Sequence, residues 1–207
     1  MKAFKLFLIA MILTSLFVEA TSVNRSYRQA LRYYEKGELN KALEKVHLSL
    51  KQSKSKEAMW LKGHILVKMK SYTRAIAFLE YKLPPGNAPD ANLTALGDCY
   101  FELENYERAL YFFREVRSLG LVELQNLGAT YFYLNHNDSA LHFMDKVVAL
   151  TPNRAVSYYA RATVYRDEMQ IDLACRDFQK ACDLGYQAGC AKLEKDNCLS
   201  WKHVWAK

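Results

Sequence analysis

The sequence predicts an all-α protein, an α-solenoid of about five stacked helix pairs with one further helix capping its C-terminal end. The first observation is a period. A small residue recurs with steps of 33, 34, 31 and 34 residues, at Ala30, Gly63, Gly97, Gly128 and Ala162. The second is that apolar residues recur at three- and four-residue spacings within each half of a period, as in amphipathic helices. A fixed period of this length is typical of stacked helical hairpins.

Each period also places an alanine twelve residues after its small residue. These alanines are Ala42, Ala75, Ala109, Ala140 and Ala174. Two helices approach closely only where a small side chain leaves room. We therefore expect Gly63 on a leading helix to face Ala75 on its trailing helix, and Gly128 to face Ala140 in the same way.

The period divides the chain into five predicted repeats. They cover residues 24–53, 57–84, 91–118, 122–152 and 155–185, within an array over residues 21–185. We expect the second trailing helix to continue to Leu83, because Pro84 and Pro85 lack the N–H that a helix needs. Gly185 is expected to end the last repeat in a left-handed conformation.

The N-terminal segment has the pattern of a secretory signal peptide, which we assign to residues 1–20. Lys2 and Lys5 precede an apolar run from Leu6 to Val18, and Ala20 provides a small residue at the cleavage point. The apolar run is shorter than the ~20 residues of a membrane-spanning helix. An uncleaved membrane anchor is the alternative interpretation.

The last segment, residues 186–207, departs from the repeat and is predicted to be a capping helix. Its apolar residues Ala191, Cys198, Trp201 and Trp205 have spacings of seven, three and four residues, which would place them on one helical stripe. A solenoid needs such a helix to cover the exposed core of its final repeat. The two tryptophans are therefore expected to pack in the cap.

Charge and motifs argue against several classes of function. The formal net charge is +7, but most basic residues are interleaved with acidic ones, and the densest run, Lys51 to Lys56, falls at a predicted turn. This pattern does not predict nucleic-acid binding. The five histidines are scattered and no catalytic or nucleotide-binding motif is present. We therefore expect no enzyme activity, no cofactor and no metal.

The repeats resemble the tetratricopeptide repeat (TPR) over about residues 24–185. The residues that match it best are Leu96-Gly97, Tyr100, Tyr106, Ala109-Leu110 and Phe113, followed by Leu127-Gly128, Tyr131 and Ala140-Leu141. The first two repeats depart from the pattern, with Ser49 and Lys82 where a small apolar residue is usual. The resemblance implies a right-handed superhelix whose leading helices line a concave groove for peptides or partner proteins.

The resemblance also implies which residues line that groove. They are Tyr27, Tyr34, Trp60, His64, Asp98, Phe101, Gln125, Phe132, Tyr159 and Arg166. Family members that capture a C-terminal carboxylate have Lys, Arg and Asn at such positions, whereas this chain has mostly aromatic residues. We therefore expect an extended or apolar peptide as ligand. The alternative is that several of these rings pack between neighbouring repeats.

Four of the five cysteines lie in the last repeat and the cap. The segment from Cys182 to Cys190 resembles the bridged hairpin of cysteine-rich, TPR-like proteins exported by bacteria. If the chain turns about Tyr186, Cys182 lies opposite Cys190, and Cys175 comes near Cys198 one level further out. We predict these two disulfides. Four buried thiols and a zinc site are the alternatives, although neither a CxxC pair nor paired histidines support zinc. Cys99 is expected to be buried.

Together these observations predict an exported, periplasmic or extracellular interaction module that binds a protein or peptide partner. The alternative is a non-catalytic structural subunit of a cell-envelope or secretion assembly, in which the outer helix faces make the contacts. Nucleic acid and metal are not expected as partners, and membrane contact is expected only through export or an uncleaved signal anchor.

Overall fold

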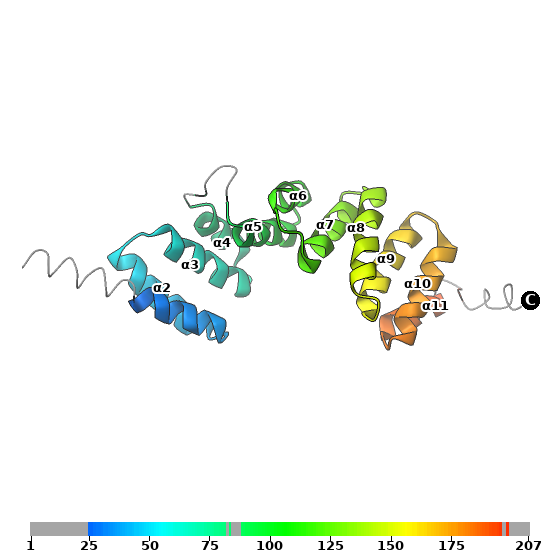
Figure 1. The fold of residues 1–207 in the computed structure, drawn as a ribbon, viewed down its shortest axis with the longest axis horizontal. Coiled ribbons are helices and arrows are strands. Elements are labelled where there is room, and N and C mark those ends of the chain that lie inside the picture. The colour runs from blue at the N-terminus through cyan, green and yellow to red at the C-terminus, as the bar shows by residue number, and fades with distance from the viewer. Residues whose placement is uncertain (1–24, 82, 84–87, 196–197, 199–207) are drawn as a thin grey trace, which may run out of the picture. The chain divides into compact units, whose positions relative to one another are not determined.

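The computed structural model describes residues 25–81, 83, 88–195 and 198, which form helices and no strand (Figure 1). In chain order the helices are one over residues 25–35, α2 (Leu39–Gln52), α3 (Lys56–Lys68), α4 (Tyr72–Leu79), α5 (Asp90–Glu102), α6 (Tyr106–Glu115), α7 (Leu121–Tyr133), α8 (Asn137–Leu150), α9 (Ala155–Asp167), α10 (Ile171–Asp183) and α11 (Gln187–Lys195). The all-α solenoid of helix pairs is confirmed. The predicted signal segment, Trp201 and Trp205 lie outside the described residues.

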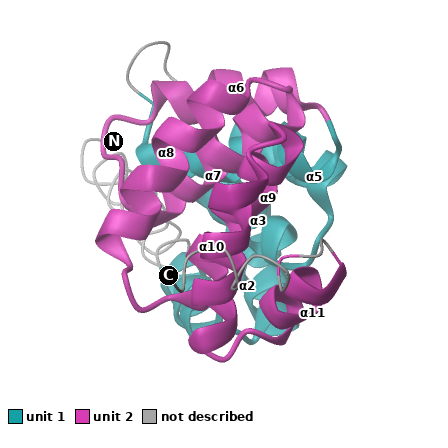
Figure 2. Cartoon of the chain, turned by 90° about the vertical axis from the view of Figure 1, so that its right-hand side faces the viewer, with its two compact units in different colours: residues 1–104 teal, residues 105–207 magenta. Residues whose placement is uncertain are grey.

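The chain divides into two compact units, residues 1–104 and 105–207 (Figure 2). In unit 1, α3 packs against α2, α4 and α5, and α4 also packs against α5. The first part of its core is made of small and aliphatic side chains. These are Ala30, Ala42, Val46, Ala58, Leu61 and Ile65.

Unit 2 stacks its helices in the same way, with α7 against α6 and α8, and α9 against α8 and α10. The final helix, α11, packs on α10. At this end the core includes half-cystines beside apolar side chains. Its buried members are Ala162, Ala174, Cys175, Phe178, Leu193 and Cys198.

The turn inside each helix pair contains one residue with positive φ. These residues are Gly37, Lys70, Glu104, Asn135 and Met169, with φ between 57° and 75°. Their steps of 33, 34, 31 and 34 residues repeat the period of the small residues. At the fourth turn the His136 N–H donates to the Tyr131 carbonyl, the hydrogen bond of a Schellman cap. The predicted left-handed stop at Gly185 is confirmed, with φ of 87°.

The small residues of the leading helices lie where the helices of a pair come closest. A Cβ at Gly63 would lie 2.7 Å from Leu79 Cγ and 3.2 Å from Leu79 N. A Cβ at Gly128 would lie 3.0 Å from Met144 Cε. The atoms that meet these glycines therefore belong to residues one turn beyond the expected Ala75 and Ala140, because the longer side chains of that turn reach back over the glycine.

Two expectations for helix ends and faces were wrong. Helix α4 ends at Leu79 rather than Leu83, and the Tyr81 carbonyl instead accepts a hydrogen bond from the Trp60 side chain, at 2.9 Å. In α11, Ala191 is exposed, whereas Gly189 and Leu193 are buried. A Cβ at Gly189 would lie 3.0 Å from the Phe178 carbonyl oxygen. The glycine therefore determines which side of α11 meets α10.

Candidate functional site

The ten predicted groove residues divide between the two units, and all ten are half-buried. We call the side of helix 25–35, α3 and α5 that carries the first six the leading face of unit 1. Its residues are Tyr27, Tyr34, Trp60, His64, Asp98 and Phe101. The corresponding side of α7 and α9, which carries Gln125, Phe132, Tyr159 and Arg166, is the leading face of unit 2.

The two tyrosines of the first helix combine packing with a cationic neighbour. Tyr27 and Tyr34 pack against the buried core of unit 1. Burial raises the pKa of both hydroxyls, and the Glu57 carboxylate raises that of Tyr27 further. The Lys68 Nζ lies 4.3 Å from the centroid of the Tyr34 ring. Lys68 is exposed and was not among the predicted residues.

Trp60 is held in place by its ring nitrogen. Its Nε1–H donates to the Tyr81 carbonyl, and the Lys56 Nζ lies 5.4 Å from its ring centroid. An indole whose polar atom is already bonded presents only its apolar ring to a ligand. Trp60 and Tyr34 therefore each pair a half-buried ring with a lysine, an arrangement that suits apolar or aromatic ligand groups.

His64 connects α3 with α5. Its Nε2 lies 2.9 Å from Asn92 Oδ1, so the ring donates to the amide oxygen. Burial lowers the pKa of His64, with the nearby Lys68 charge acting in the same direction and the Asn92 bond opposing them. The imidazole is therefore neutral at pH 7, which leaves Nδ1 as a hydrogen-bond acceptor. Asn92 is itself 3% exposed, and its Nδ2 has no partner in the described part of the chain.

Asp98 and Phe101 complete the leading face of unit 1 on α5, which lies against α3. Between them Cys99 is fully buried, as expected, and carries a free thiol. Burial raises the pKa of this thiol to about 12. It is therefore protonated at neutral pH and unsuited to nucleophilic chemistry.

On α7 the structure adds two exposed apolar residues to Gln125 and Phe132. Val122 is 55% exposed and Tyr133 is 52% exposed. Their positions, three before and eight after Gln125, place them on the same side of the helix. The Tyr133 ring stacks on Tyr106, with centroids 4.8 Å apart and an interplanar angle of 9°. The helical spacing of this stripe was readable in the sequence, but the exposure of Val122 and Tyr133 at its two ends was not.

Tyr159 on α9 was predicted to line the groove, with packing between neighbouring repeats as the alternative, and its ring packs against other aromatic rings. Its ring centroid lies 5.5 Å from that of Phe178 and 5.1 Å from that of Tyr186. Tyr159 is thus part of the packing of α9 on α10 and the turn that follows. Arg166 is half-buried, and Val156, on the same side of α9 as Tyr159, is 43% exposed. Helix α8 packs against both α7 and α9.

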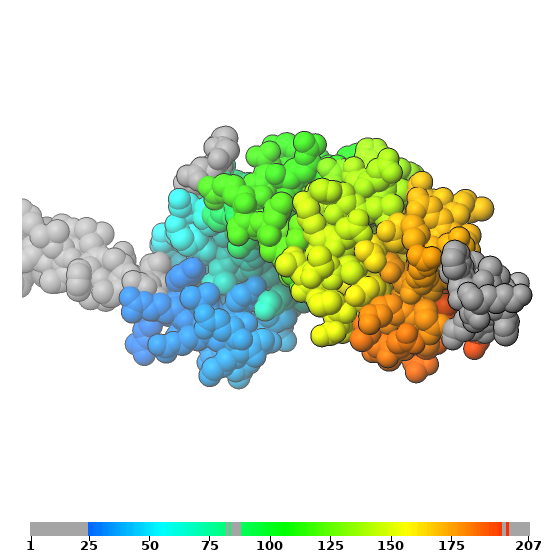
Figure 3. Space-filling view, turned by 45° about the vertical axis from the view of Figure 1, so that its right-hand side comes forward, coloured from blue at the N-terminus to red at the C-terminus, as the bar shows by residue number. Residues whose placement is uncertain are grey.

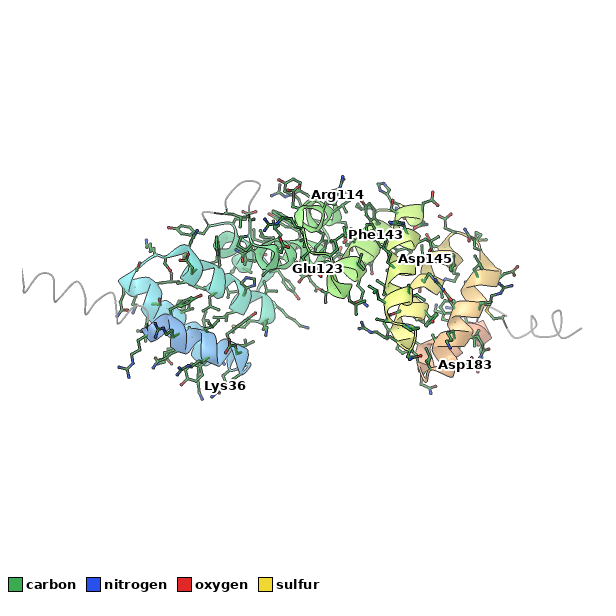
Figure 4. The ribbon with its side chains drawn as sticks, viewed as in Figure 1. Lys36, Arg114, Glu123, Phe143, Asp145 and Asp183 are labelled. Atoms are coloured by element: carbon green, nitrogen blue, oxygen red, sulfur yellow. A yellow bond between two sulfur atoms is a disulfide. The ribbon has the colours of Figure 1, made fainter. Side chains whose placement is uncertain are left out.

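Away from the leading face, unit 2 has a charge network centred on Arg161 of α9. Arg161 Nε lies 2.7 Å from Asp177 Oδ2, and Nη2 lies 2.9 Å from Asp177 Oδ1, a two-pronged pairing. Its Nη1 lies 2.8 Å from Oδ1 of Asp145 on α8, the residue labelled in Figure 4. The Asp177 bond is the main cause that raises the pKa of Arg161. This network joins three helices and exposes little of the guanidinium.

Two disulfides hold the C-terminal end of unit 2. Cys182 bonds Cys190 across the turn between α10 and α11, with Cα atoms 4.8 Å apart. Cys175 bonds Cys198, with Cα atoms 5.5 Å apart. Both pairings are those expected from the sequence. In Figure 3 the residues of α10 and α11 (orange) form one continuous surface.

No three His, Cys, Asp or Glu side chains in the described ranges gather in a way that would hold a metal ion. Likewise, the described part of the chain contains no helix with both the length and the apolar character needed to cross a bilayer.

Comparison with known proteins identifies the repeat and the fold. The tetratricopeptide repeat family profile matches residues 56–80, which include α3 and α4. Two solved structures of MamA, designated MSR-1 and AMB-1, are 20% and 19% identical, both with TM-scores of 0.70. They match 80% of this chain, over 98% and 92% of their own chains. No curated protein matches the sequence significantly.

A third similar structure is YrrB, described as a TPR protein with an unusual peptide-binding site. It is 21% identical, with a TM-score of 0.68, over 77% of this chain and 84% of its own. The chain therefore carries a tetratricopeptide repeat and has the fold of TPR solenoids. Its last repeat is rich in cysteine, as the sequence indicated.

Proposed function

We propose that the chain is an exported, non-catalytic protein-interaction module that binds an extended, largely apolar peptide segment of a partner on its leading faces. The fold supports this proposal, because an array of helix pairs offers an extended surface for binding. The side chains support it as well. In unit 1, Trp60 and Tyr34 present rings whose polar or cationic contacts are already made within the protein.

The observation that carries the proposal is the stripe on α7. Val122 and Tyr133 are both more than half exposed on the side that also carries Gln125 and Phe132. An exposed apolar stripe of this kind loses unfavourable contact with water when a peptide covers it. Gln125 adds a side-chain amide able to bond a peptide backbone in either direction.

A random peptide library displayed on phage, selected against the oxidised protein, tests the proposal. We expect enriched peptides to be rich in apolar and aromatic residues. The double variant Val122→Ser, Tyr133→Ser should lose about tenfold or more in affinity for them, because two apolar anchors each contribute on the order of 1 kcal/mol.

The matched control is Leu150→Ser, which also removes an exposed apolar side chain. Leu150 is 62% exposed but lies on α8, a trailing helix. Peptides that bind both variants as well as the unchanged protein would contradict the proposal. So would a selection that enriches no apolar motif.

Export is part of the same proposal and rests on the sequence of residues 1–20 together with the two disulfides. Disulfides persist in oxidising compartments and are rare in the cytosol. Mass spectrometry of the protein recovered from its native cell should find a mature chain that begins near Thr21, and alkylation after denaturation without reduction should modify Cys99 and no other cysteine. Alkylation of all five cysteines without reduction would contradict export to an oxidising compartment.

A structural subunit of a cell-envelope or secretion assembly is the second candidate, and exposed apolar residues on trailing helices favour it. Tyr111 on α6 and Leu150 on α8 are 57% and 62% exposed. If the outer faces make the contacts, Leu150→Ser should weaken association with a stoichiometric partner while the α7 double variant leaves it unchanged. The two variants therefore separate the two functions.

A further inference from the structure

The same position in two repeats carries a basic residue with opposite surroundings. Arg161 and Lys62 each stand one residue before the small residue of their leading helix, Ala162 and Gly63. The other residues at this position are apolar or uncharged: Gln29, Leu96 and Leu127. A charge here points toward the trailing helices, on the opposite side of the helix from the leading face.

In unit 2 the positive charge at this position is neutralised by carboxylates. Asp177, fifteen residues after Ala162, and Asp145, seventeen residues after Gly128 of the preceding repeat, both bond Arg161 within 2.8 Å. The distances show that these three repeat positions converge on one point. The positive charge of Arg161 therefore has two carboxylate partners within the fold.

In unit 1 the equivalent positions hold no carboxylate. Fifteen residues after Gly63 stands Phe78, and seventeen residues after Ala30 stands His47. The Lys62 Nζ lies 4.2 Å from the centroid of the Phe78 ring. Among the described residues, Lys62 forms no ion pair. Its ammonium group is half-buried and held over an aromatic ring without a counter-ion.

Two further cations lie on the helices that pack against α3. Lys51 is one turn beyond His47 on α2, and Arg74 lies on α4, one turn before Phe78. Burial, followed by the positive charges of Lys62, Arg74 and Lys51, lowers the pKa of His47, so the three cations lie within electrostatic reach of the imidazole. Burial and the Arg74 charge likewise lower the pKa of Lys62.

The acidic residues nearby in sequence do not relieve this charge. Glu44, one turn before His47 on α2, bonds Lys45 at 2.8 Å. Glu80, the residue that follows α4, accepts a hydrogen bond from Tyr100. Neither carboxylate contributes to the pKa of His47 or Lys62. The cluster from α2, α3 and α4 thus contains three basic side chains and one imidazole.

We propose that His47, Lys51, Lys62 and Arg74 form a binding site for a phosphate group, on the opposite side of α3 from Trp60 and His64. A guanidinium fork and two ammonium groups match the oxygens of a doubly charged tetrahedral anion. The bound phosphate supplies Lys62 with the negative charge that Asp145 and Asp177 supply to Arg161. The site is independent of peptide binding on the leading faces.

The test is a titration of inorganic phosphate into the full oxidised chain, at constant ionic strength held with chloride. Isothermal calorimetry measures affinity, and NMR follows the His47 imidazole. We expect bound phosphate to raise the pKa of His47 toward its ordinary value, because a nearby anion favours the charged ring. A His47 titration that phosphate leaves unchanged would overturn the proposal.

Charge-matched variants locate the site. Lys62→Gln should weaken phosphate binding about tenfold, the effect of one charge-assisted hydrogen bond. Lys36→Gln removes the same charge from the exposed turn after the first helix (Figure 4) and should leave the affinity within about twofold, because Lys36 does not contribute to the pKa of His47 or Lys62 and its charge is screened by solvent. Equal losses for the two variants would overturn the proposal in favour of non-specific attraction.

Lys62→Leu keeps the test valid if the glutamine variant folds poorly, since leucine stands at positions 96 and 127. His47→Asp should abolish phosphate binding because it supplies an internal carboxylate partner at the Asp145 position, whereas His47→Asn should retain most of it.

A vesicle-binding experiment distinguishes free phosphate compounds from lipid headgroups as the ligand. Sedimentation with phosphatidic acid vesicles that is lost in Lys62→Gln and retained in Lys36→Gln would identify a headgroup as the phosphate source. Sedimentation that both variants retain, without any phosphate effect on His47, would overturn the site.

Discussion

The two ends of the array are closed in different ways. At the N-terminal end, the outer side of helix 25–35 carries Arg25, Arg28 and Arg32, all exposed, over a core of alanine, valine, leucine and isoleucine. At the C-terminal end, α11 covers the last pair and two disulfides hold it there. A terminal repeat must hide its apolar side or make it polar. This chain has a polar outer side at its N-terminal end and covers the apolar side with α11 at its C-terminal end.

The C-terminal end depends more on covalent bonds than the N-terminal end does. Helix α11 has nine residues, fewer than an isolated helix needs to be stable in water. Its buried residues are Gly189, which has no side chain, and Leu193, so little apolar side chain holds it in place. The first pair, in contrast, buries Ala30, Ala42 and Val46 completely. We infer that the C-terminal end depends on its disulfides and that the N-terminal end, over the residues that the structure describes, depends on packing.

Reduction of both disulfides should produce the largest effect. The closed loops have sequence separations of 8 and 23 residues. Loop-closure entropy assigns them about 2.5 and about 3.4 kcal/mol of stabilisation. Hydrogen exchange by mass spectrometry should show α10 and α11 losing protection after reduction while helix 25–35 and α2 keep theirs. Equal loss at both ends would contradict the comparison.

The second prediction contrasts the two basic residues inside the units. Asp177→Ala should lower the free energy of unfolding of unit 2 by about 3 kcal/mol, because it leaves the partly buried Arg161 with one exposed partner. Lys62→Leu should leave unit 1 unchanged or slightly more stable, since no internal partner is lost. Urea denaturation followed by hydrogen exchange of each unit measures both. A comparable loss of stability in Asp177→Ala and Lys62→Leu would contradict this difference between Arg161 and Lys62.

Glycine substitutions compare the packing within two helix pairs. Gly63→Ala should cost about 2 kcal/mol, because its Cβ would lie too close to the side chain and the backbone nitrogen of Leu79. Gly128→Ala should cost less than about 1 kcal/mol, since the atoms that it would meet belong to the flexible Met144 side chain. Thermal unfolding of the two variants provides the ranking, and the reverse order would contradict it.

Acidification should destabilise unit 1 through its histidines. The pKa values of His64 and His47 are lowered in the folded chain, so the unfolded chain binds protons more readily as the pH falls. The free energy of unfolding should therefore decrease as the pH falls below about 6.5, the ordinary pKa of histidine. His64→Gln should remove part of this dependence. A stability profile flat between pH 7 and 5 would contradict the assignment.

The helix pairs could be predicted from the sequence because a small residue recurs once in each pair, at the point where its two helices come close together. The sequence also predicted the two disulfides, because cysteines eight residues apart about a turn face each other. The surroundings of Lys62 and Arg161 were not readable, since their partners lie on other helices about fifteen residues away. The burial of Gly189 in place of Ala191 was missed for a similar reason: the α10 surface selects the side of α11 that fits.

The smallest predicted effect concerns Ser49, which departs from the repeat pattern in the first pair. Ser49 is fully buried, and its Oγ has no hydrogen-bond partner in the described residues. At the equivalent position of the last repeat stands Ala181, also fully buried. Ser49→Ala should therefore raise the free energy of unfolding of unit 1 by about 1 kcal/mol, because it removes an unpaired buried hydroxyl. Ala181→Ser, the reciprocal change, should lower that of unit 2. If urea denaturation shows Ser49→Ala to be destabilising, the hydroxyl has a partner, and packing alone does not hold the N-terminal end.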